Sequence, residues 1–288
     1  MFLPRKILEA KLLGILTEDL GQGDVTSASV ISPETTASAQ VIAKQNGIVA
    51  GVEEAVVLCQ SLGLKVEERV KDGDAIRAGQ CCLDIRGDAR TILAVERTLL
   101  NIMSRMSGIA TSTKRAVEKI RRINRKVRIA STRKTAPGLL YFDKKAVLIG
   151  GGDTHRLHLD DLVLIKDNHI AVAGSIAETV KKAREDVSFG KKIEVEVTTT
   201  KDAQTAVTAG ADIIMFDNMA PETLVKAVKQ LKKMKSPTHI LFEASGGITL
   251  DNVEKYAEAG VDVISMGALT SSSEALDISL EIRKSAIK

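Results

Sequence analysis

The chain has 288 residues, of which 44% are hydrophobic and only 2% aromatic, so its core must be built from aliphatic side chains. Forty-one Lys and Arg residues against 37 Asp and Glu give a net charge of +4, which is too small to indicate a nucleic-acid-binding protein. No apolar run approaches the roughly 18 residues of a membrane span, so no membrane partner is expected. The length allows one large domain or two ordinary ones.

The three cysteines give an odd number without CxxC spacing, because Cys59 stands alone and Cys81 and Cys82 are adjacent. This pattern predicts reduced thiols in a cytoplasmic protein. At the N-terminus, charges interrupt residues 1–24 every few positions, and no small-residue cleavage site follows. This segment is therefore predicted to be an amphipathic helix and not a signal peptide.

Short strand patterns fill the N-terminal part of the chain. Residues 37–51 and 64–87 carry Asn-Gly, Asp-Gly and Ala-Gly pairs, which are typical of turns between antiparallel strands. A helix is predicted over 89–107. Serines in capping positions begin a second predicted helix in the C-terminal stretch, which returns to this part of the chain. We therefore predict a separate α+β domain made of residues 1–107 and 271–288.

Residues 108–270 show a regular alternation of strand and helix patterns. Such alternation indicates parallel strands joined by crossover helices, and six units, with room for a seventh strand, suit a barrel better than an open sheet. The predicted strands are 126–131, 162–166, 193–197, 212–217, 239–245 and 261–267. The predicted helices between them are 175–186, 201–210, 220–234 and 250–260.

Charged residues or glycines follow each of the six predicted strands. One polar residue at a strand end is common, but an unbroken series is informative, because the active sites of β/α barrels lie at the C-terminal strand ends. Glycines after the last two strands favour phosphate binding on bare backbone N–H groups, although helix capping alone explains one such turn. In chain order these residues are Arg133 and Lys134, Lys166, Glu196, Asp217, Ser245 with Gly246 and Gly247, and Gly267 with Ala268.

Two glutamates alternate with apolar residues in the strand IEVEV. Glu194 and Glu196 therefore share one face, which should point into the barrel interior. A buried carboxylate is costly unless it is paired or metal-bound, and an ion pair with a nearby lysine is the simpler explanation. Because Asp217 follows the next strand, however, two carboxylates lie at one rim, and such a sparse oxygen set suits Mg²⁺.

Cationic residues surround the buried run 162–165. Arg156 precedes this run and Lys166 follows it, and both are predicted to join Arg133 and Lys134 in one cluster. Arginine binds carboxylates through two parallel hydrogen bonds, whereas lysine acts as a point charge. The mixture predicts an anionic ligand with several negative groups.

Three other functions, namely zinc binding, Schiff-base chemistry and nucleic-acid binding, fit the sequence less well. His155 and His158 have HxxH spacing, but no third ligand of a suitable type is nearby, so zinc is not expected. Lys166 could form a Schiff base in an aldolase, but that reading leaves the paired carboxylates and glycine turns unexplained. The basic run 119–128 lacks interleaved aromatic residues and is predicted to be a solvated helix end, not a nucleic-acid site.

Several motifs, in order along the chain, resemble those of the decarboxylating quinolinate phosphoribosyltransferases, the nicotinate-nucleotide pyrophosphorylase family. The likeness covers nearly the whole chain, and the combination of TRKTxPG, GGGxxHR and KDNH is highly specific. One departure is Leu139-Leu140, where a more basic sequence is expected. The motifs are EDLGQGDVTS (18–27), AVERTLLN (94–101), TRKTAPG (132–138), GGGDTHR (150–156), LIKDNH (164–169), EVEV, DNM, EASGGI (243–248) and SMGALT (265–270).

The resemblance implies an open α/β sandwich followed by an incomplete TIM-like α/β barrel, in a homodimer or a higher assembly of dimers with shared active sites. It implies transfer of the ribosyl phosphate of phosphoribosyl pyrophosphate (PRPP) to the ring nitrogen of quinolinate, with release of pyrophosphate and CO2. A paralogue of the same fold linked to molybdenum transport remains the alternative, although KDNH and GGGDTHR favour the biosynthetic enzyme.

The resemblance also implies the role of each matching residue. The catalytic residues would be Lys134, Glu196 and Asp217, the last two also holding Mg²⁺ and the ribose hydroxyls. Quinolinate would be held by Arg133, His155, Arg156 and Lys166, and by Arg97 of the neighbouring subunit. The 5′-phosphate of PRPP would be held by Ser245, Gly246, Gly247, Gly267 and Ala268.

Overall fold

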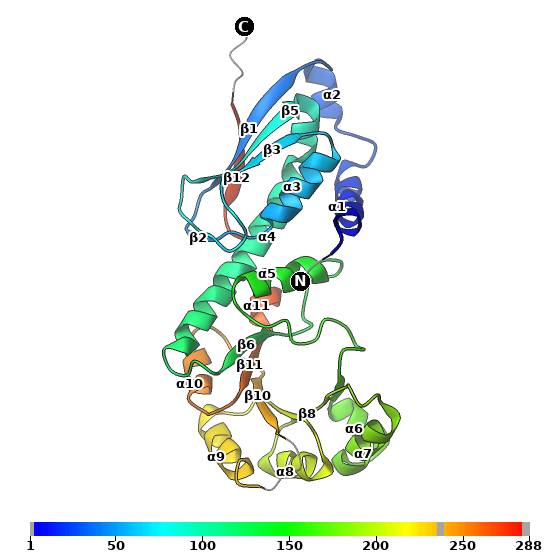
Figure 1. Cartoon of the computed structure of the whole chain (residues 1–288), viewed down its shortest axis with the longest axis vertical. Coiled ribbons are helices and arrows are strands. Elements are labelled where there is room, and N and C mark those ends of the chain that lie inside the picture. The colour runs from blue at the N-terminus through cyan, green and yellow to red at the C-terminus, as the bar shows by residue number, and fades with distance from the viewer. Residues whose placement is uncertain (1–2, 235–238, 284–288) are drawn as a thin grey trace. The chain divides into compact units, whose positions relative to one another are not determined.

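The structure, a computed structural model, describes residues 3–234 and 239–283 (Figure 1). The chain divides into two compact units. The first comprises Met1–Ser112, Tyr141–Gly150 and Ser273–Lys288, and the second Thr113–Leu140 and Gly151–Ser272. None of the helices in the described ranges is long and apolar enough to cross a membrane.

The first unit is built on a four-stranded antiparallel sheet in the order β12-β1-β5-β3. Antiparallel strands were predicted in this part of the chain, and they are present. The strands are β1 (Thr36–Ala43), β3 (Lys65–Glu68), β5 (Cys81–Asp88) and β12 (Ile278–Arg283), with β2 (Gly47–Ile48) and β4 (Ala75–Ile76) forming a separate pair.

Five helices accompany this sheet. They are α1 (Arg5–Leu20), α2 (Val25–Val30), α3 (Val52–Ser61), α4 (Ala89–Arg121) and α5 (Leu140–Ile149). The predicted N-terminal amphipathic helix is confirmed, because Leu8, Leu12 and Leu16 recur every fourth residue on the buried face of α1. Asp24 then caps α2, its carboxylate accepting a hydrogen bond from the backbone N–H of Ser27.

The prediction of a C-terminal helix was wrong, because this stretch forms strand β12, which pairs with β1 so that Leu280 faces Val41. The serines at 271–273 suggested a helix cap, but Ile278, Leu280 and Ile282 alternate with polar residues. That period of two is the period of a strand. Residues 284–288 of the predicted helix lie outside the described residues.

Helix α4 continues to Arg121, 14 residues beyond its predicted end at 107. It includes Gly108, although glycine is a poor helix former. Its place is explained by packing: a Cβ there would lie 2.0 Å from the carbonyl oxygen of Glu274. The compact units accordingly differ from the predicted domain ranges, since the first includes residues up to 112 and also Tyr141–Gly150.

The second unit contains a six-stranded parallel sheet in the order β6-β11-β10-β9-β8-β7, which confirms all six predicted strands. The strands are β6 (Arg128–Ser131), β7 (Val163–Ile165), β8 (Ile193–Val197), β9 (Ile213–Asp217), β10 (Leu241–Ser245) and β11 (Val263–Met266). The helices are α6 (Asp167–Ala173), α7 (Ile176–Asp186), α8 (Thr200–Ala209), α9 (Pro221–Leu231), α10 (Val253–Ala257) and α11 (Ala268–Ser271).

The sheet curves into an incomplete barrel with helices α7 to α10 outside it (Figure 1). The first strand in the chain, β6, pairs with the last, β11, and on its other side makes a single parallel bridge from Ala130 to Asp153. Within the described ranges no strand ladder joins this bridge to β7. The room left for a seventh strand is therefore occupied by one bridging residue, and the barrel remains open there.

Candidate active site

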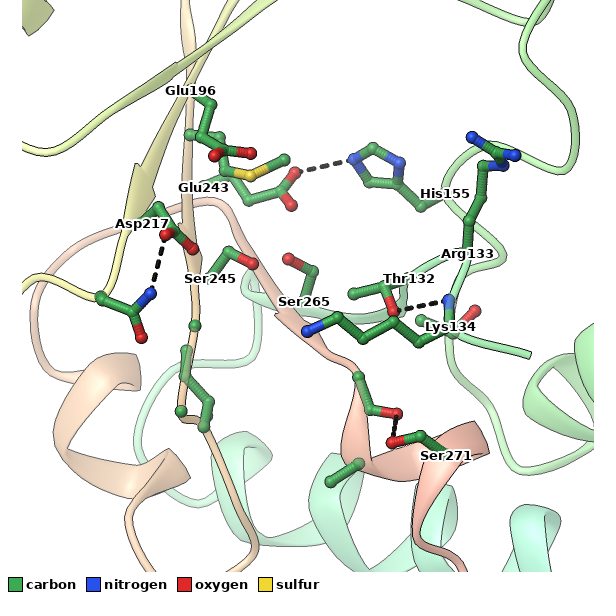
Figure 2. Close-up of a pocket in the computed structure, with 18 of the residues that line it drawn as sticks. Thr132, Arg133, Lys134, His155, Glu196, Asp217, Glu243, Ser245, Ser265 and Ser271 are labelled. Carbon is green, nitrogen blue, oxygen red and sulfur yellow. Dashed lines mark hydrogen bonds and ion pairs between the residues drawn. The ribbon is translucent and has the colours of Figure 1, made fainter. Parts of the chain in front are cut away.

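A pocket of about 640 Å³ opens at the C-terminal ends of the six strands of the second unit (Figure 2). Every residue predicted for the site lines it except Arg97. The residues brought together are Arg133, Lys134, His155, Arg156, Lys166, Glu196, Asp217, Ser245, Gly246, Gly247, Gly267 and Ala268. Arg97 is an exposed residue of α4 in the first unit, and its proposed place in a partner's site stays a prediction.

Lys134 is held at the pocket by contacts of its backbone. Its N–H donates to the hydroxyl of Thr132 at 3.2 Å, and its carbonyl accepts from the hydroxyl of Thr270 at 2.8 Å. The side chain passes close over Gly267, where an added Cβ would lie 3.1 Å from Lys134 Cδ. A lysine fixed at its base but flexible toward its tip can place a positive charge within the pocket.

Two arginines add to the positive charge of this pocket. Arg156 is buried, and its burial and the neighbouring charge of Arg133 lower its pKa, although an arginine stays charged. Figure 2 shows Arg133 on the opposite side of the pocket from the carboxylates Glu196 and Asp217. Arg133 therefore lies across the pocket from these two carboxylates, whereas Lys166 lies next to one of them, Glu196.

The two rim carboxylates each have one engaged oxygen. Lys166 Nζ lies 2.5 Å from Glu196 Oε2. This is the ion pair with a nearby lysine that was the simpler of the two explanations for a carboxylate facing the barrel interior. Asp217 Oδ2 accepts from the side-chain amide of Asn218 at 2.7 Å. Among the described residues, Glu196 Oε1 and Asp217 Oδ1 have no hydrogen-bond partner. Two such oxygens at one rim are ligands of the kind that Mg²⁺ uses.

The turn after β10 depends on two unusual backbone conformations. Gly246 has φ 86°, and a Cβ there would lie 2.5 Å from Asn218 Oδ1, so only glycine fits. Asn218 itself has φ 52° and donates its N–H to the carbonyl of Ser245 at 2.9 Å. Asn218 therefore holds Asp217 on one side and the glycine turn on the other.

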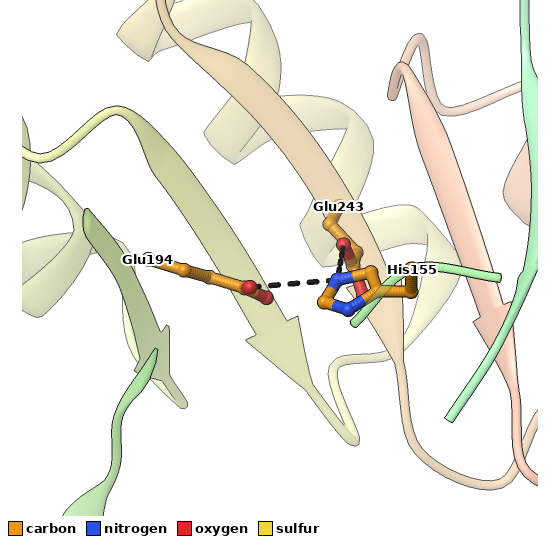
Figure 3. A group of neighbouring side chains, drawn as sticks. All are labelled: His155, Glu194 and Glu243. Carbon is orange, nitrogen blue, oxygen red and sulfur yellow. Dashed lines mark hydrogen bonds and ion pairs between the residues drawn. The ribbon is translucent and has the colours of Figure 1, made fainter. Parts of the chain in front are cut away.

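His155 contacts two buried carboxylates on neighbouring parts of the barrel interior (Figure 3). Its Nε2 lies 3.0 Å from Glu243 Oε2 and 3.4 Å from Glu194 Oε2. Burial alone would lower the pKa of His155, but the contacts with Glu194 and Glu243 outweigh it and raise the pKa to about 10. The imidazole is therefore a cation at neutral pH.

This ion pair predicts a specific pH dependence of stability. Because the folded pKa of about 10 exceeds the unfolded value of about 6.5, the stabilisation is complete below pH 6.5 and is lost as the pH rises through 10. We expect the free energy of unfolding to fall more steeply over this range in the wild type than in His155→Gln. Denaturant unfolding at several pH values measures this. His158→Gln, at an exposed position, is the control, and equal slopes in wild type and His155→Gln would contradict the assignment.

Sequence reasoning missed three residues that shape this site. Glu243 interrupts the apolar run LFEAS, and a charge at mid-strand was a usable signal of an inward-facing side chain. Asn218 follows Asp217 directly in the motif DNM, but its left-handed backbone leaves no mark in the sequence. Ser265 also lines the pocket and has a buried hydroxyl without a hydrogen-bond partner in the described chain.

Together the fold and site define an α/β-barrel protein with a pocket at its strand ends that is lined by cationic side chains, carboxylates and glycine turns. Comparison with known proteins narrows this class. Residues 24–107 match the N-terminal domain and residues 109–281 the C-terminal domain of quinolinate phosphoribosyl transferase. The chain belongs to the quinolinate phosphoribosyl transferase family.

Individual relatives resemble the chain over nearly all of its length. A protein of Methanothermobacter thermautotrophicus, named probable nicotinate-nucleotide pyrophosphorylase [carboxylating], is 47% identical over 269 residues, covering 93% of this chain and 96% of its own. The nicotinate-nucleotide pyrophosphorylase [carboxylating] of Mycobacterium leprae is 37% identical over 272 residues, covering 93% and 94%. The solved nicotinate-nucleotide pyrophosphorylase of Francisella tularensis superimposes with a TM-score of 0.89 at 34% identity, covering 98% of both chains. The predicted α+β domain and incomplete barrel are thereby confirmed.

Proposed function

We propose that this chain is a nicotinate-nucleotide pyrophosphorylase [carboxylating] that transfers the phosphoribosyl group of PRPP to the ring nitrogen of quinolinate. The products are nicotinate mononucleotide, pyrophosphate and CO2, a step of NAD biosynthesis. The observation that carries the proposal is the single pocket at the ends of six strands, where four arginine and lysine side chains, two rim carboxylates and two glycine turns come together. The family of the chain, and its relatives named for this activity, support the same reaction.

The cationic side chains of the pocket suit the quinolinate dicarboxylate. Arg133 and Arg156 would pair with its carboxylates through parallel hydrogen bonds, and His155 and Lys166 would add single charges. In the structure Lys166 pairs with Glu196, so a bound carboxylate would compete with Glu196 for this amine. The glycine turns after β10 and β11 would hold the 5′-phosphate on backbone N–H groups.

Chemistry then requires mainly positioning and charge stabilisation. The lone pair of the ring nitrogen attacks ribose C1, and the bond from C1 to the pyrophosphate oxygen breaks with its electrons leaving on pyrophosphate. Positive charge that develops on the ribose would be stabilised by Glu196 and Asp217, and Lys134 would stabilise the leaving group. The ribosylated ring nitrogen is cationic, so loss of CO2 from the adjacent carbon leaves an electron pair beside N⁺, which a proton then takes up. Holding both anions together is the main contribution of the protein.

We also propose that Glu196 and Asp217 hold Mg²⁺, for which their free oxygens are suitable donors. Mg²⁺ bound there would supply positive charge to the pyrophosphate. The substitutions Glu196→Gln and Asp217→Asn are each expected to raise the Mg²⁺ concentration required for half-maximal activity, because each removes a negative charge.

Titration of activity with Mg²⁺ at saturating substrates measures this requirement. Glu185→Gln, on the exposed surface of α7, is the control, and it should leave the Mg²⁺ requirement unchanged. Because Glu196→Gln also frees Lys166, the KM for quinolinate is determined separately in each variant. An unchanged Mg²⁺ requirement in both site variants would mean that these carboxylates are structural.

A homodimer, or an assembly of dimers, with Arg97 completing the partner's site is part of the proposal, as is a cytoplasmic location. Support for the location comes from the free thiols of Cys59, Cys81 and Cys82. The activity itself is tested by chromatography of reactions that contain PRPP with quinolinate, with nicotinate, or with neither. Nicotinate mononucleotide should form rapidly only with quinolinate, and its absence would refute the proposed reaction.

A further inference from the structure

We propose that Glu243, together with Glu194, is a positioning residue that holds His155 as an imidazolium with its Nδ1–H directed at an anionic substrate group. The inference rests on the proposed function in one respect, that the substrate group is a carboxylate of quinolinate. The proposal gives Glu194 and Glu243, two residues inside the barrel, a role in substrate recognition that does not require either of them to contact the substrate.

The geometry determines which imidazole nitrogen carries a proton. Glu243 Oε2 is 3.0 Å and Glu194 Oε2 3.4 Å from the same atom, His155 Nε2 (Figure 3). The two carboxylates come from strands β10 and β8, and these residues are 1% and 0% exposed. The hydrogen bond at 3.0 Å is the one to Glu243, and because an ionised carboxylate can only accept hydrogen bonds, Nε2 must be its donor.

The second imidazole nitrogen is left available to a ligand. His155 lines the pocket, and its Nδ1 has no hydrogen-bond partner among the described residues. The backbone of His155 is fixed in the left-handed region at φ 53°, and its N–H donates to Asp153 Oδ1 at 2.8 Å. A non-glycine residue held in this conformation is typical of a functional site. His155 is thus held at two points, by the hydrogen bond of its backbone N–H and by the hydrogen bond of its ring Nε2.

The charges around His155 favour a proton on both ring nitrogens. Glu194 faces it from β8, and Glu243 faces it from β10. Burial and the charge of Glu243 raise the pKa of Glu194, whereas the contacts with His155 and the charge of Arg156 oppose this rise. Both oxygens of Glu194 and Oε1 of Glu243 lack a hydrogen-bond partner in the described chain. A neutral His155 would leave two buried carboxylates without their nearest cation, which is costly. The raised pKa of His155, about 10, agrees with this reasoning.

With both nitrogens protonated, Nδ1–H is a charge-assisted donor, which an anionic carboxylate accepts strongly. Glu243→Gln keeps the shape of the side chain but removes one of the two carboxylates that lie next to His155 Nε2. We expect the KM for quinolinate to rise roughly 10-fold or more, because a hydrogen bond to a charged group is weakened. The KM for PRPP should change little. Glu54→Gln, which alters a buried glutamate of the first unit, is the matched control and should change neither constant.

The protonation of His155 can be read directly and without substrate. The chain has four histidines, so ¹⁵N-labelled imidazole signals can be assigned by comparison with His155→Gln. At about pH 8.5, above the ordinary histidine pKa of about 6.5, His155 should show two protonated ring nitrogens in the wild type and lose this signature in Glu243→Gln.

A neutral His155 ring in the wild type at this pH would overturn the proposal. That result includes the case in which His155, Glu194 and Glu243 bind a metal ion, because a coordinated Nε2 carries no proton. If Glu243→Gln does not fold, the wild-type spectrum still decides. If the spectrum is as expected but quinolinate is not a substrate, the proposed function fails while the positioning of His155 stands. An unchanged KM for quinolinate in a folded Glu243→Gln would refute the role in recognition.

Discussion

Replacement of Lys134 by alanine is expected to lower kcat roughly 100-fold or more, because it would remove the charge that we propose acts on the leaving pyrophosphate in the transition state. The backbone of Lys134 is held by its hydrogen bonds to Thr132 and Thr270, and its side chain passes over Gly267 into the pocket. Since these contacts involve the backbone and not the amine, the substitution should leave the fold intact.

Steady-state kinetics of Lys134→Ala, together with its thermal unfolding, separate loss of chemistry from loss of structure. Lys201→Ala, at an exposed position of α8, serves as the control for removing a lysine from the same unit. A folded Lys134→Ala with near-normal turnover would remove this residue from the mechanism.

The second large effect is expected for Arg97→Ala. The family resemblance gives this exposed residue of α4 to the partner's quinolinate pocket, as a third guanidinium for the dicarboxylate. Arg97→Ala and Lys134→Ala should therefore each be inactive alone. If every site takes Arg97 from one chain and Lys134 from the other, a mixed dimer of the two variants contains one intact site.

Random reassembly of equal amounts makes half of the dimers mixed, so about a quarter of wild-type activity should return. The two variants are mixed by co-expression or by unfolding and refolding, and differential tags show how many mixed dimers form. Arg115→Ala, an exposed arginine farther along the same helix, should retain full activity. No recovery in the presence of mixed dimers would place Arg97 in its own chain's site or outside any site.

The barrel could be predicted well from the sequence because its strands are buried apolar runs with a polar residue at the end of each. In IEVEV the alternation also placed Glu194 and Glu196 on one inward face, and in the structure Glu196 lines the pocket while Glu194 is buried beside His155. The prediction failed where a local signal conflicted with packing. The helix predicted to end at 107 continues through Gly108, where only a glycine leaves room for the backbone of Glu274. The C-terminal stretch was predicted to be a helix because of its capping serines near 271, although the alternation of apolar and polar residues in β12 is typical of a strand.

The residues predicted at the strand ends line one pocket, as expected from their positions after the strands. The missed parts depend on spatial arrangement. His155 and Glu243 are 88 residues apart, and nothing in either motif shows that they share a hydrogen bond. Likewise, the fit of Gly246 against Asn218 arises only when β9 and β10 lie side by side. Sequence patterns indicate which residues face the pocket, but the partners that set their charge and orientation come from tertiary structure.

The proposed reaction is tested most directly by the fate of the two carboxyl carbons of quinolinate. Samples labelled with ¹³C at either the C2 or the C3 carboxyl are incubated with PRPP, Mg²⁺ and the enzyme, and CO2, pyrophosphate and nicotinate mononucleotide are quantified. Loss of CO2 next to the cationic ring nitrogen predicts label in CO2 only from the C2 carboxyl, in amounts equal to pyrophosphate and nucleotide, and only when PRPP is present. Pyrophosphate without CO2, CO2 without PRPP, or label released from the C3 carboxyl would contradict the account.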